Sequence, residues 1–110
     1  MKNTIRKELE DYIKVGIDEM RRYKELPNDL SDLHHELFNQ DYYIIGYYQA
    51  DQWLLSHRLN AFEAIGIVQE YENENFGECK MYDNSESVVN MLAYIYGEEL
   101  LSEIQEEIIS

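Results

Sequence analysis

Cysteine, proline and long hydrophobic runs are scarce in this sequence, and each shortage narrows the kind of protein that it encodes. Cys79 is the only cysteine, so no disulfide can form within the chain, and we expect a protein of the reducing cytoplasm. Pro27 is the only proline, and the sequence has no proline-rich linker, repeat or low-complexity tract. No apolar run approaches the ~20 residues that cross a bilayer, so we expect neither a membrane-spanning helix nor a secretory leader.

Basic residues are also few. The chain has nine Lys and Arg residues against 23 Asp and Glu, which gives a formal net charge of −14 over 110 residues. A field of this sign repels the phosphate backbone, so we do not expect direct binding of nucleic acid. Hydrophobic residues make up 45% of the sequence, which is enough to form a core in a chain of this length. We therefore predict a single folded domain over residues 1–110.

The first third of the chain predicts two helices with a turn between them. Over residues 4–26, apolar side chains recur at spacings of three and four, and Gly16 lies within their stripe, where it would let another helix approach closely. Pro27 ends this helix, and Asn28 or Ser31 caps a shorter one. The stripe of the first helix comprises Ile5, Leu9, Tyr12, Ile13, Met20 and Tyr23, and that of the second Leu30, Leu33 and Leu37.

Residues 41–57 form the most aromatic and apolar segment of the chain. Read as a helix, the segment is apolar on two adjacent faces, which predicts a central helix packed on two sides. Its aromatic and β-branched run, residues 42–45, is also compatible with a short strand. Periodicity does not separate a short buried strand from a buried helix, so both alternatives stay open.

A capping signal marks the next helix. Asn60 followed by Glu63 resembles a capping box and predicts a helix over residues 61–75, which Gly77 ends in the left-handed conformation. The apolar side of this helix is predicted to hold Phe62, Ile65, Val68 and Phe76, and its far side to hold Glu63, Glu70 and Glu74.

The capping pattern recurs before the last apolar segment. Asp83 with Glu86 opens a helix, but after Gly97 the apolar stripe is displaced by about 160°. This displacement indicates that Gly97 breaks the helix and that Glu98 begins another. The whole pattern predicts an all-α bundle of five or six helices, with residues 41–56 and 61–76 at its centre.

No motif in the sequence predicts a reaction. His34 and His35 are neighbours, so on a helix they point about 100° apart and cannot bind one ion together, and His57 is distant in sequence. The sequence has no nucleophile elbow and no glycine-rich phosphate loop. We therefore predict a protein that is not an enzyme, with no metal site and no cofactor. Exposed tyrosines would suit a binding protein, and the candidates are Tyr42, Tyr71 and Tyr96.

Charge is distributed unevenly along the chain. Residues 1–60 carry a net charge of −3, whereas residues 61–110 carry −11 and have Lys80 as their single base. Carboxylates on the outward face of the last predicted helix recur about every 5–6 Å, which is similar to the spacing of phosphates along DNA. The surface is either a solvated face that keeps the protein soluble or a nucleic-acid mimic that meets a basic groove on another protein. Its candidate partner-binding residues are Glu63, Glu70, Glu74, Glu99, Glu103, Glu106 and Glu107.

Three blocks of the sequence carry a resemblance to a known family. The blocks are HHELFN (34–39), DYYIIGYYQA (41–50) and VVNMLAYIYGEELL (88–101). With the segments around them they resemble a family of small acidic proteins from bacteriophages and prophages. The resemblance implies a phage origin and a compact domain with no known catalytic residues. By type rather than residue by residue, it suggests an anti-restriction or anti-CRISPR protein, whose partner would be a basic nucleic-acid-binding protein or complex of the host.

The amino-terminal segment lies outside these blocks and mixes both signs of charge. Its acids and bases fall at helical spacing, which predicts salt bridges along an exposed face. The alternative is a patch that meets the acidic half of a second copy and makes a homodimer. A homo-oligomer with a structural or regulatory role in the phage is the leading alternative function, and in it the acidic face would only solubilise the protein.

Overall fold

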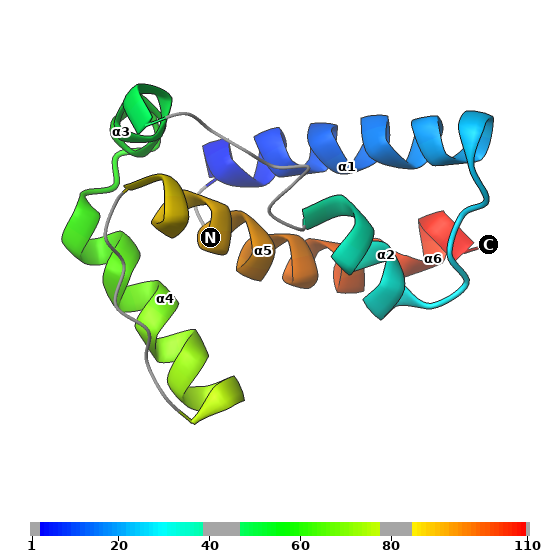
Figure 1. Ribbon diagram of the computed structural model, residues 1–110. Helices are drawn as coiled ribbons and strands as arrows, with labels where there is room; N and C mark the ends of the chain where they lie inside the picture. The colour runs from blue at the N-terminus through cyan, green and yellow to red at the C-terminus, as the bar shows by residue number, and fades with distance from the viewer. Residues whose placement is uncertain (1–2, 39–46, 78–84, 110) are drawn as a thin grey trace.

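The structure, a computed structural model, describes residues 3–38, 47–77 and 85–109, and every element in these ranges is an α-helix (Figure 1). The prediction of an all-α fold with five or six helices is confirmed for the described part of the chain. The helices are α1 (Asn3–Tyr23), α2 (Leu30–Phe38), α3 (Tyr47–Ser56), α4 (Ala61–Phe76), α5 (Ser85–Glu103) and α6 (Gln105–Ile109).

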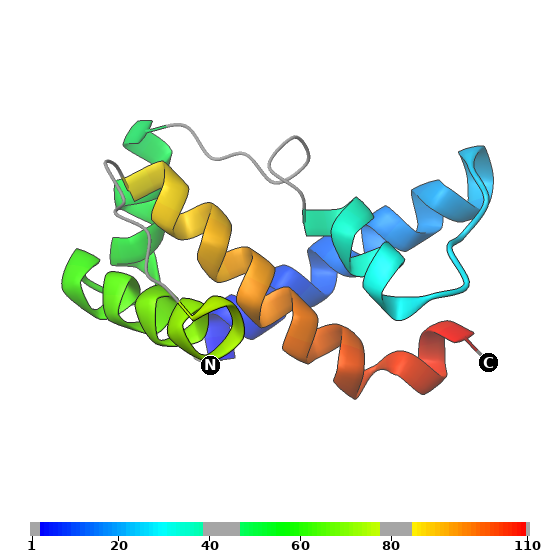
Figure 2. The ribbon, with the colours of Figure 1, turned by 60° about the horizontal axis from the view of Figure 1, so that its bottom comes forward.

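Helix α5 is the centre of the fold, and it packs against each of the other five helices. Figures 1 and 2 show it running through the middle of the molecule, with α3 and the start of α4 beside its first turns and α2 toward its last turns. The prediction that residues 41–56 and 61–76 form the centre is therefore wrong for α3 and α4, and residues 41–46 lie outside the described residues. Helix α5 is buried on several sides, through Val88, Val89, Leu92, Ala93, Ile95, Tyr96, Leu100 and Leu101.

The predicted break at Gly97 is also wrong, because α5 continues without interruption to Glu103. The two displaced apolar stripes lie on one helix because that helix has partners on several sides. Gly97 serves close packing instead. A Cβ atom at this position would lie 2.4–2.7 Å from three ring carbons of Phe38, so only a glycine lets the α2 ring approach the α5 backbone so closely.

A second glycine admits the neighbouring side chain of α2. A Cβ atom on Gly16 of α1 would lie 2.4 Å from Cδ2 of Leu37, which confirms the predicted close approach of another helix at this position. The last turn of α2 is thus wedged between α1 and α5 at two glycines. The Tyr12 hydroxyl adds a hydrogen bond from α1 to the Leu37 carbonyl oxygen.

The first two helices are close to their prediction. The buried face of α1 holds Ile5, Leu9 and Ile13 of the predicted stripe together with Ile17, which was not predicted. Tyr12 and Met20 of the stripe are partly buried, and the predicted place of Tyr23 in it is wrong, because this side chain is 81% exposed at the end of the helix. The cap of α2 is Asp29 rather than Asn28 or Ser31. The Asp29 carboxylate accepts a hydrogen bond from the Ser31 N–H at 2.7 Å, and the Asp29 carbonyl oxygen accepts one from Leu33.

Both predicted ends of α4 are confirmed. The Asn60 side chain accepts a hydrogen bond from the Glu63 N–H, and Gly77 takes the left-handed conformation with φ of 76°. The predicted apolar side is only partly right. Phe62 and Phe76 are 88% and 60% exposed, and the buried positions of α4 are Ala64, Val68 and Glu72.

The possible strand at residues 42–45 and the predicted cap at Asp83 lie outside the described residues. Within the described ranges, no helix has the length and hydrophobicity needed to cross a membrane. Buried side chains of α1 to α5 form one hydrophobic cluster, and Ile104 packs against it just before α6.

Candidate functional site

The seven predicted partner-binding glutamates are all exposed. On α4, Glu63, Glu70 and Glu74 lie on the face opposite the buried positions, as predicted. Glu63 is also part of the helix cap, where its carboxylate accepts a hydrogen bond from the Asn60 side chain at 2.9 Å. Glu72 points the other way and is only 2% exposed, so α4 presents three outward carboxylates.

The other four glutamates do not form the predicted single row. Glu99 and Glu103 are on α5, whereas Glu106 and Glu107 are on α6, and the two helices are separated at Ile104. The Glu107 N–H donates to the Ile104 carbonyl oxygen at 3.0 Å, three residues back, so the regular helical repeat does not run through this point. The four carboxylates therefore belong to two short acidic stretches.

One of these carboxylates is already paired within the chain. The Arg6 guanidinium of α1 lies 2.6 Å from Glu103 Oε2 and 2.9 Å from Glu10 Oε1. The hydrogen bond to Glu103 raises the pKa of Arg6 above its ordinary value, and the bond to Glu10 adds to this effect. The contact with Glu10, four residues away on α1, confirms the predicted salt bridging along this helix at this position.

Tyr71 and Glu98 bring α4 and α5 together at the acidic surface. The Tyr71 hydroxyl donates a hydrogen bond of 2.8 Å to Glu98 Oε2. Partial burial raises the pKa of Tyr71 well above its ordinary value of 10.0, and the hydrogen bond to Glu98 contributes to the rise. The sequence pattern predicts Glu98 only as the start of a helix, and its pairing with Tyr71 was not predicted.

Two cavities meet at this pair. One, the acidic cavity, has a volume of about 390 Å³ and is lined by Tyr71, Ile95, Glu98, Glu99, Ser102 and Glu103. The other, the aromatic cavity, has a volume of about 380 Å³ and shares Tyr71, Glu98 and Ser102 with the first. The rest of its wall comes from α2, α4 and α5, through Leu30, Ser31, His34, Asn75, Phe76, Tyr94 and Leu101.

The three tyrosines expected at an interface have different outcomes. Tyr71 is half-buried and lines both cavities. Tyr96 is buried in the core, and its expected exposure is wrong, because α5 is covered on this side as well. Burial raises the pKa of Tyr96, and the nearby carboxylate of Glu99 adds to the rise. Tyr42 lies outside the described residues.

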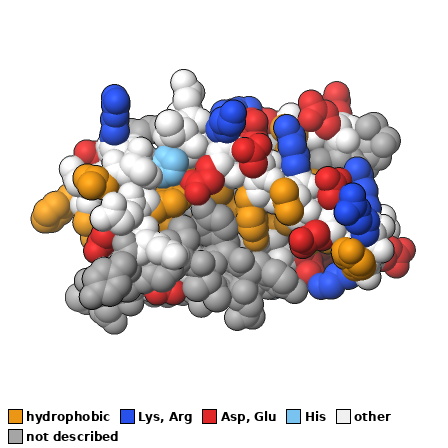
Figure 3. Space-filling view, turned by 90° about the horizontal axis from the view of Figure 1, so that it is seen from above, with side chains coloured by type: hydrophobic (Ala, Val, Ile, Leu, Met, Phe, Trp, Pro, Cys, Tyr) orange, Lys and Arg blue, Asp and Glu red, His pale blue; other side chains and the backbone are white. Residues whose placement is uncertain are grey.

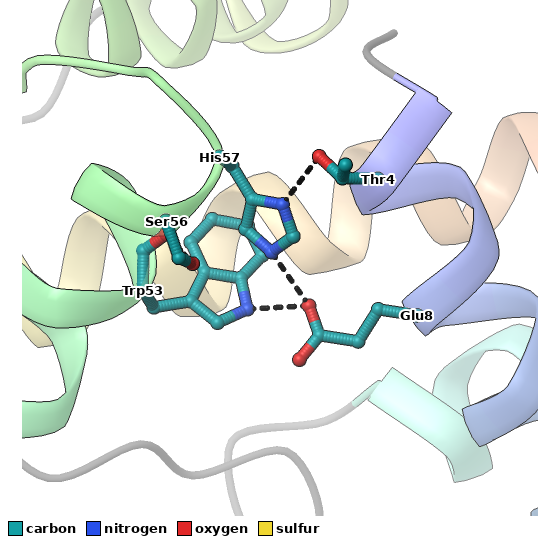
Figure 4. A network of polar contacts seen from close by, with 5 residues as sticks. All are labelled: Thr4, Glu8, Trp53, Ser56 and His57. Atoms are coloured by element: carbon teal, nitrogen blue, oxygen red, sulfur yellow. Dashed lines mark hydrogen bonds and ion pairs between the residues drawn. The ribbon is translucent and has the colours of Figure 1, made fainter.

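A polar network joins α1 to the end of α3 (Figure 4). Glu8 Oε2 accepts hydrogen bonds from Trp53 Nε1 at 2.6 Å and from His57 Nε2 at 2.9 Å. Because a carboxylate only accepts, Nε2 is the protonated ring nitrogen, and in the neutral ring His57 Nδ1 accepts from the Thr4 hydroxyl at 2.7 Å. The network uses both nitrogens of a histidine that is 8% exposed.

Hydrogen bonds link the Thr4 hydroxyl, the His57 imidazole and the Glu8 carboxylate in a row. Hydrolases use the same three groups to activate a nucleophile. Here the carboxylate oxygen is shared with the Trp53 indole, whose ring packs edge-on against His57 at 4.4 Å. Thr4, Glu8 and His57 line neither the acidic nor the aromatic cavity. We assign the network to the docking of α3 on α1.

A third cavity of about 470 Å³ lies between α1 and α2 and is lined in part by Val15, Glu19, Tyr23 and Glu36. The face of the molecule over α1 and α3 carries Lys and Arg side chains interspersed with Asp and Glu (Figure 3). It therefore lacks the single sign of charge that the outward carboxylates give to α4 and the end of α5. Among the described residues, no group of three or more His, Cys, Asp or Glu side chains is placed to hold a metal ion.

No known family, curated protein sequence or solved structure matches this chain. The resemblance to phage proteins therefore stays an expectation from the sequence. The candidate site rests on the geometry of α4, α5 and α6 alone.

Proposed function

We propose that the chain is a phage-encoded, non-enzymatic binding protein that inhibits a nucleic-acid-directed defence complex of the host, of the anti-CRISPR or anti-restriction type. In the host cytoplasm, a basic nucleic-acid groove of that complex would meet carboxylates of α4, α5 and α6 in place of phosphates. The observation that carries the proposal is that all seven candidate residues are exposed and that residues 61–110, where they lie, contain a single base. These residues are Glu63, Glu70, Glu74, Glu99, Glu103, Glu106 and Glu107.

The electrostatics of this surface favour association with a basic partner. Carboxylates within a Debye length of about 8 Å repel one another, and a basic groove relieves that repulsion on binding. Complementary charge also steers the encounter and makes the association rate fall with salt. Glu98 strengthens the surface beside Glu99, whereas Glu103 is partly neutralised by Arg6. We therefore place the strongest contacts at Glu98 and Glu99.

The proposal is tested by capture and competition. The tagged protein is incubated with host lysate at low salt and at about 0.5 M salt, where surface charges are screened beyond about 4 Å. We expect a basic protein to be captured at low salt and released at high salt. After this partner is identified and purified, the chain should displace nucleic acid from it at a fixed stoichiometry.

Two variants with equal change in charge make the test specific. One neutralises the acidic cavity through Glu98→Gln, Glu99→Gln and Glu103→Gln. The other neutralises exposed acids of the amino-terminal segment through Asp11→Asn, Asp18→Asn and Glu25→Gln. We expect only the first to lose displacement of nucleic acid. Equal loss in both would mean that net charge alone drives binding, and unchanged displacement in the first would remove the acidic surface from the mechanism.

A second candidate function is a homo-oligomer, and exposed apolar side chains favour it. Leu55 on α3 and Phe62 on α4 are 71% and 88% exposed, and Tyr23 on α1 is 81% exposed. Light scattering as a function of concentration distinguishes the two functions. The homo-oligomer requires a mass above 13.2 kDa that falls to that value in a Leu55→Ser, Phe62→Ser variant. The inhibitor proposal places those two side chains outside the contact and expects the variant to keep its partner.

A further inference from the structure

The aromatic cavity combines a size, a set of rings and a charge that together suit one kind of ligand. Its volume of about 380 Å³ lies within the ~300–1,000 Å³ that is typical of sites for small ligands or single side chains. Three helices contribute to it, the first turns of α2, the last two turns of α4 and the second half of α5. Its floor includes the buried side chains of His34 and Leu101.

Four rings stand around this cavity in two pairs. Tyr71 and Phe76 of α4 meet edge-on with ring centroids 6.1 Å apart. His34 of α2 and Tyr94 of α5 are 4.2 Å apart, and His34 is fixed by the hydrogen bond that its Nε2 donates to the Tyr94 carbonyl oxygen at 2.7 Å. The faces of tyrosine and phenylalanine rings attract cations, and guanidinium groups stack on them more often than ammonium groups do.

One carboxylate stands at the junction of the two cavities. The Tyr71 hydroxyl donates a hydrogen bond to Oε2 of Glu98 and holds the carboxylate in place. The other carboxylate oxygen, Oε1, is a second hydrogen-bond acceptor. A carboxylate fixed in this way is ready to accept from the N–H groups of a planar cation. The neighbouring acidic cavity adds Glu99 and Glu103 on the other side of the same pair. An anionic ligand is therefore disfavoured here, and a cationic one is favoured.

We propose that the aromatic cavity binds the guanidinium group of an arginine side chain presented by the basic partner protein, between the rings of Tyr71 and Tyr94 and the carboxylate of Glu98. This inference rests on the proposed function for the source of the arginine, and it deepens that function by naming the anchor. Further basic side chains of the same partner segment would then lie along the acidic cavity. The carboxylates of α4 and α6 serve to attract the partner, and the cavity selects it.

The test needs no host partner. Nuclear magnetic resonance titration of the full chain uses N-acetyl-arginine methylamide, with N-acetyl-citrulline methylamide as the uncharged analogue of the same shape. We expect the arginine derivative to shift signals of Ser31, Asn75 and Ser102, which line the cavity, and to bind about fivefold more tightly than citrulline. Equal binding of both, or shifts confined to other surfaces, would overturn the proposal.

Variants separate the cavity from the general charge of the protein. Glu98→Gln keeps an acceptor for Tyr71 and removes the charge, so it should weaken arginine binding about fivefold, whereas Glu106→Gln on α6 should leave it unchanged. Phe76→Leu removes an exposed ring of the cavity and leaves the Glu98 carboxylate in place. It should weaken arginine binding about 2.5-fold or more. Equal effects of Glu98→Gln and Glu106→Gln would contradict the proposal.

This inference and the proposed function fail in different ways. If arginine binds in the cavity but no basic host protein is captured, the anchor stands and the inhibitor function falls. If a basic protein is captured through the acidic surface but arginine does not shift the cavity signals, the inhibitor function stands and the anchor falls.

Discussion

Glu8 and Glu98 are both helical carboxylates that accept a hydrogen bond from an aromatic side chain, yet they lie in different surroundings. Glu8 Oε2 accepts from the Trp53 indole at 2.6 Å and also from His57, so two donors of the same chain converge on one oxygen. Glu98 accepts from the Tyr71 hydroxyl at 2.8 Å and borders two cavities. The same kind of pair therefore joins two helices at one end of the fold and borders two cavities at the other.

Removing each carboxylate gives the largest expected contrast. Glu8→Ala leaves the Trp53 and His57 donors without their acceptor, and each such donor costs about 1 kcal/mol or more when water replaces the bond poorly. We expect the free energy of unfolding to fall by about 1–3 kcal/mol. Glu98→Ala, at an exposed position, should change it by less than about 0.5 kcal/mol. Urea denaturation measures the free energy of unfolding of both variants. Equal losses would show that the Glu8 and Glu98 hydrogen bonds contribute equally to stability.

A second contrast compares an inward glycine with an outward one. Gly97→Ala places a Cβ atom against the Phe38 ring, and overpacking of about 1–3 kcal/mol outweighs the gain of about 1 kcal/mol in helix propensity. We expect a net loss of up to about 2 kcal/mol. Gly66→Ala on α4 meets nothing within 4 Å and should stabilise the fold by up to about 1 kcal/mol. Thermal unfolding of both variants checks the sign of each change, and a stabilised Gly97→Ala variant would refute the close packing of α2 on α5.

The smallest expected effect concerns alkaline pH. The pKa values of Tyr71 and Tyr96 are raised in the folded protein, so their contribution to stability is present below their ordinary pKa of 10.0 and is lost as pH rises through the folded values. We expect the free energy of unfolding to fall above about pH 10, and to fall less steeply in Tyr71→Phe. Denaturation at a series of pH values measures the slope. A slope unchanged by Tyr71→Phe would mean that neither the partial burial of Tyr71 nor its bond to Glu98 raises its pKa in the folded protein.

Local signals in the sequence were sufficient to predict several of the helices. The capping box at Asn60 and the left-handed Gly77 act through neighbouring backbone groups, so α4 begins and ends where it was predicted. The stripe of α1 faces one partner layer and repeats regularly. The prediction failed where contacts between residues far apart in the sequence determine the structure. Gly97 reads as a helix break until Phe38, 59 residues earlier in sequence, is placed against it.

The candidate site was predictable only in part. The exposure of the seven glutamates follows from periodicity and from the composition of residues 61–110. The Tyr71–Glu98 pair joins residues 27 positions apart, and the Glu8–Trp53 bond joins residues 45 apart. No local pattern encodes such pairs. The predicted row of carboxylates on one helix is divided between α5 and α6 at Ile104, which packs against the hydrophobic core.

The claim that the acidic surface around Glu98 acts on a host defence is tested most directly by phage infection. Host cells with an active restriction or CRISPR system express the chain, and the efficiency of plating of a sensitive phage is measured. We predict that the natural chain and the Asp11→Asn, Asp18→Asn, Glu25→Gln variant restore plating, whereas the Glu98→Gln, Glu99→Gln, Glu103→Gln variant, folded and expressed to the same level, does not. Restoration of plating by both variants would show that the acidic surface around Glu98 is not needed for inhibition.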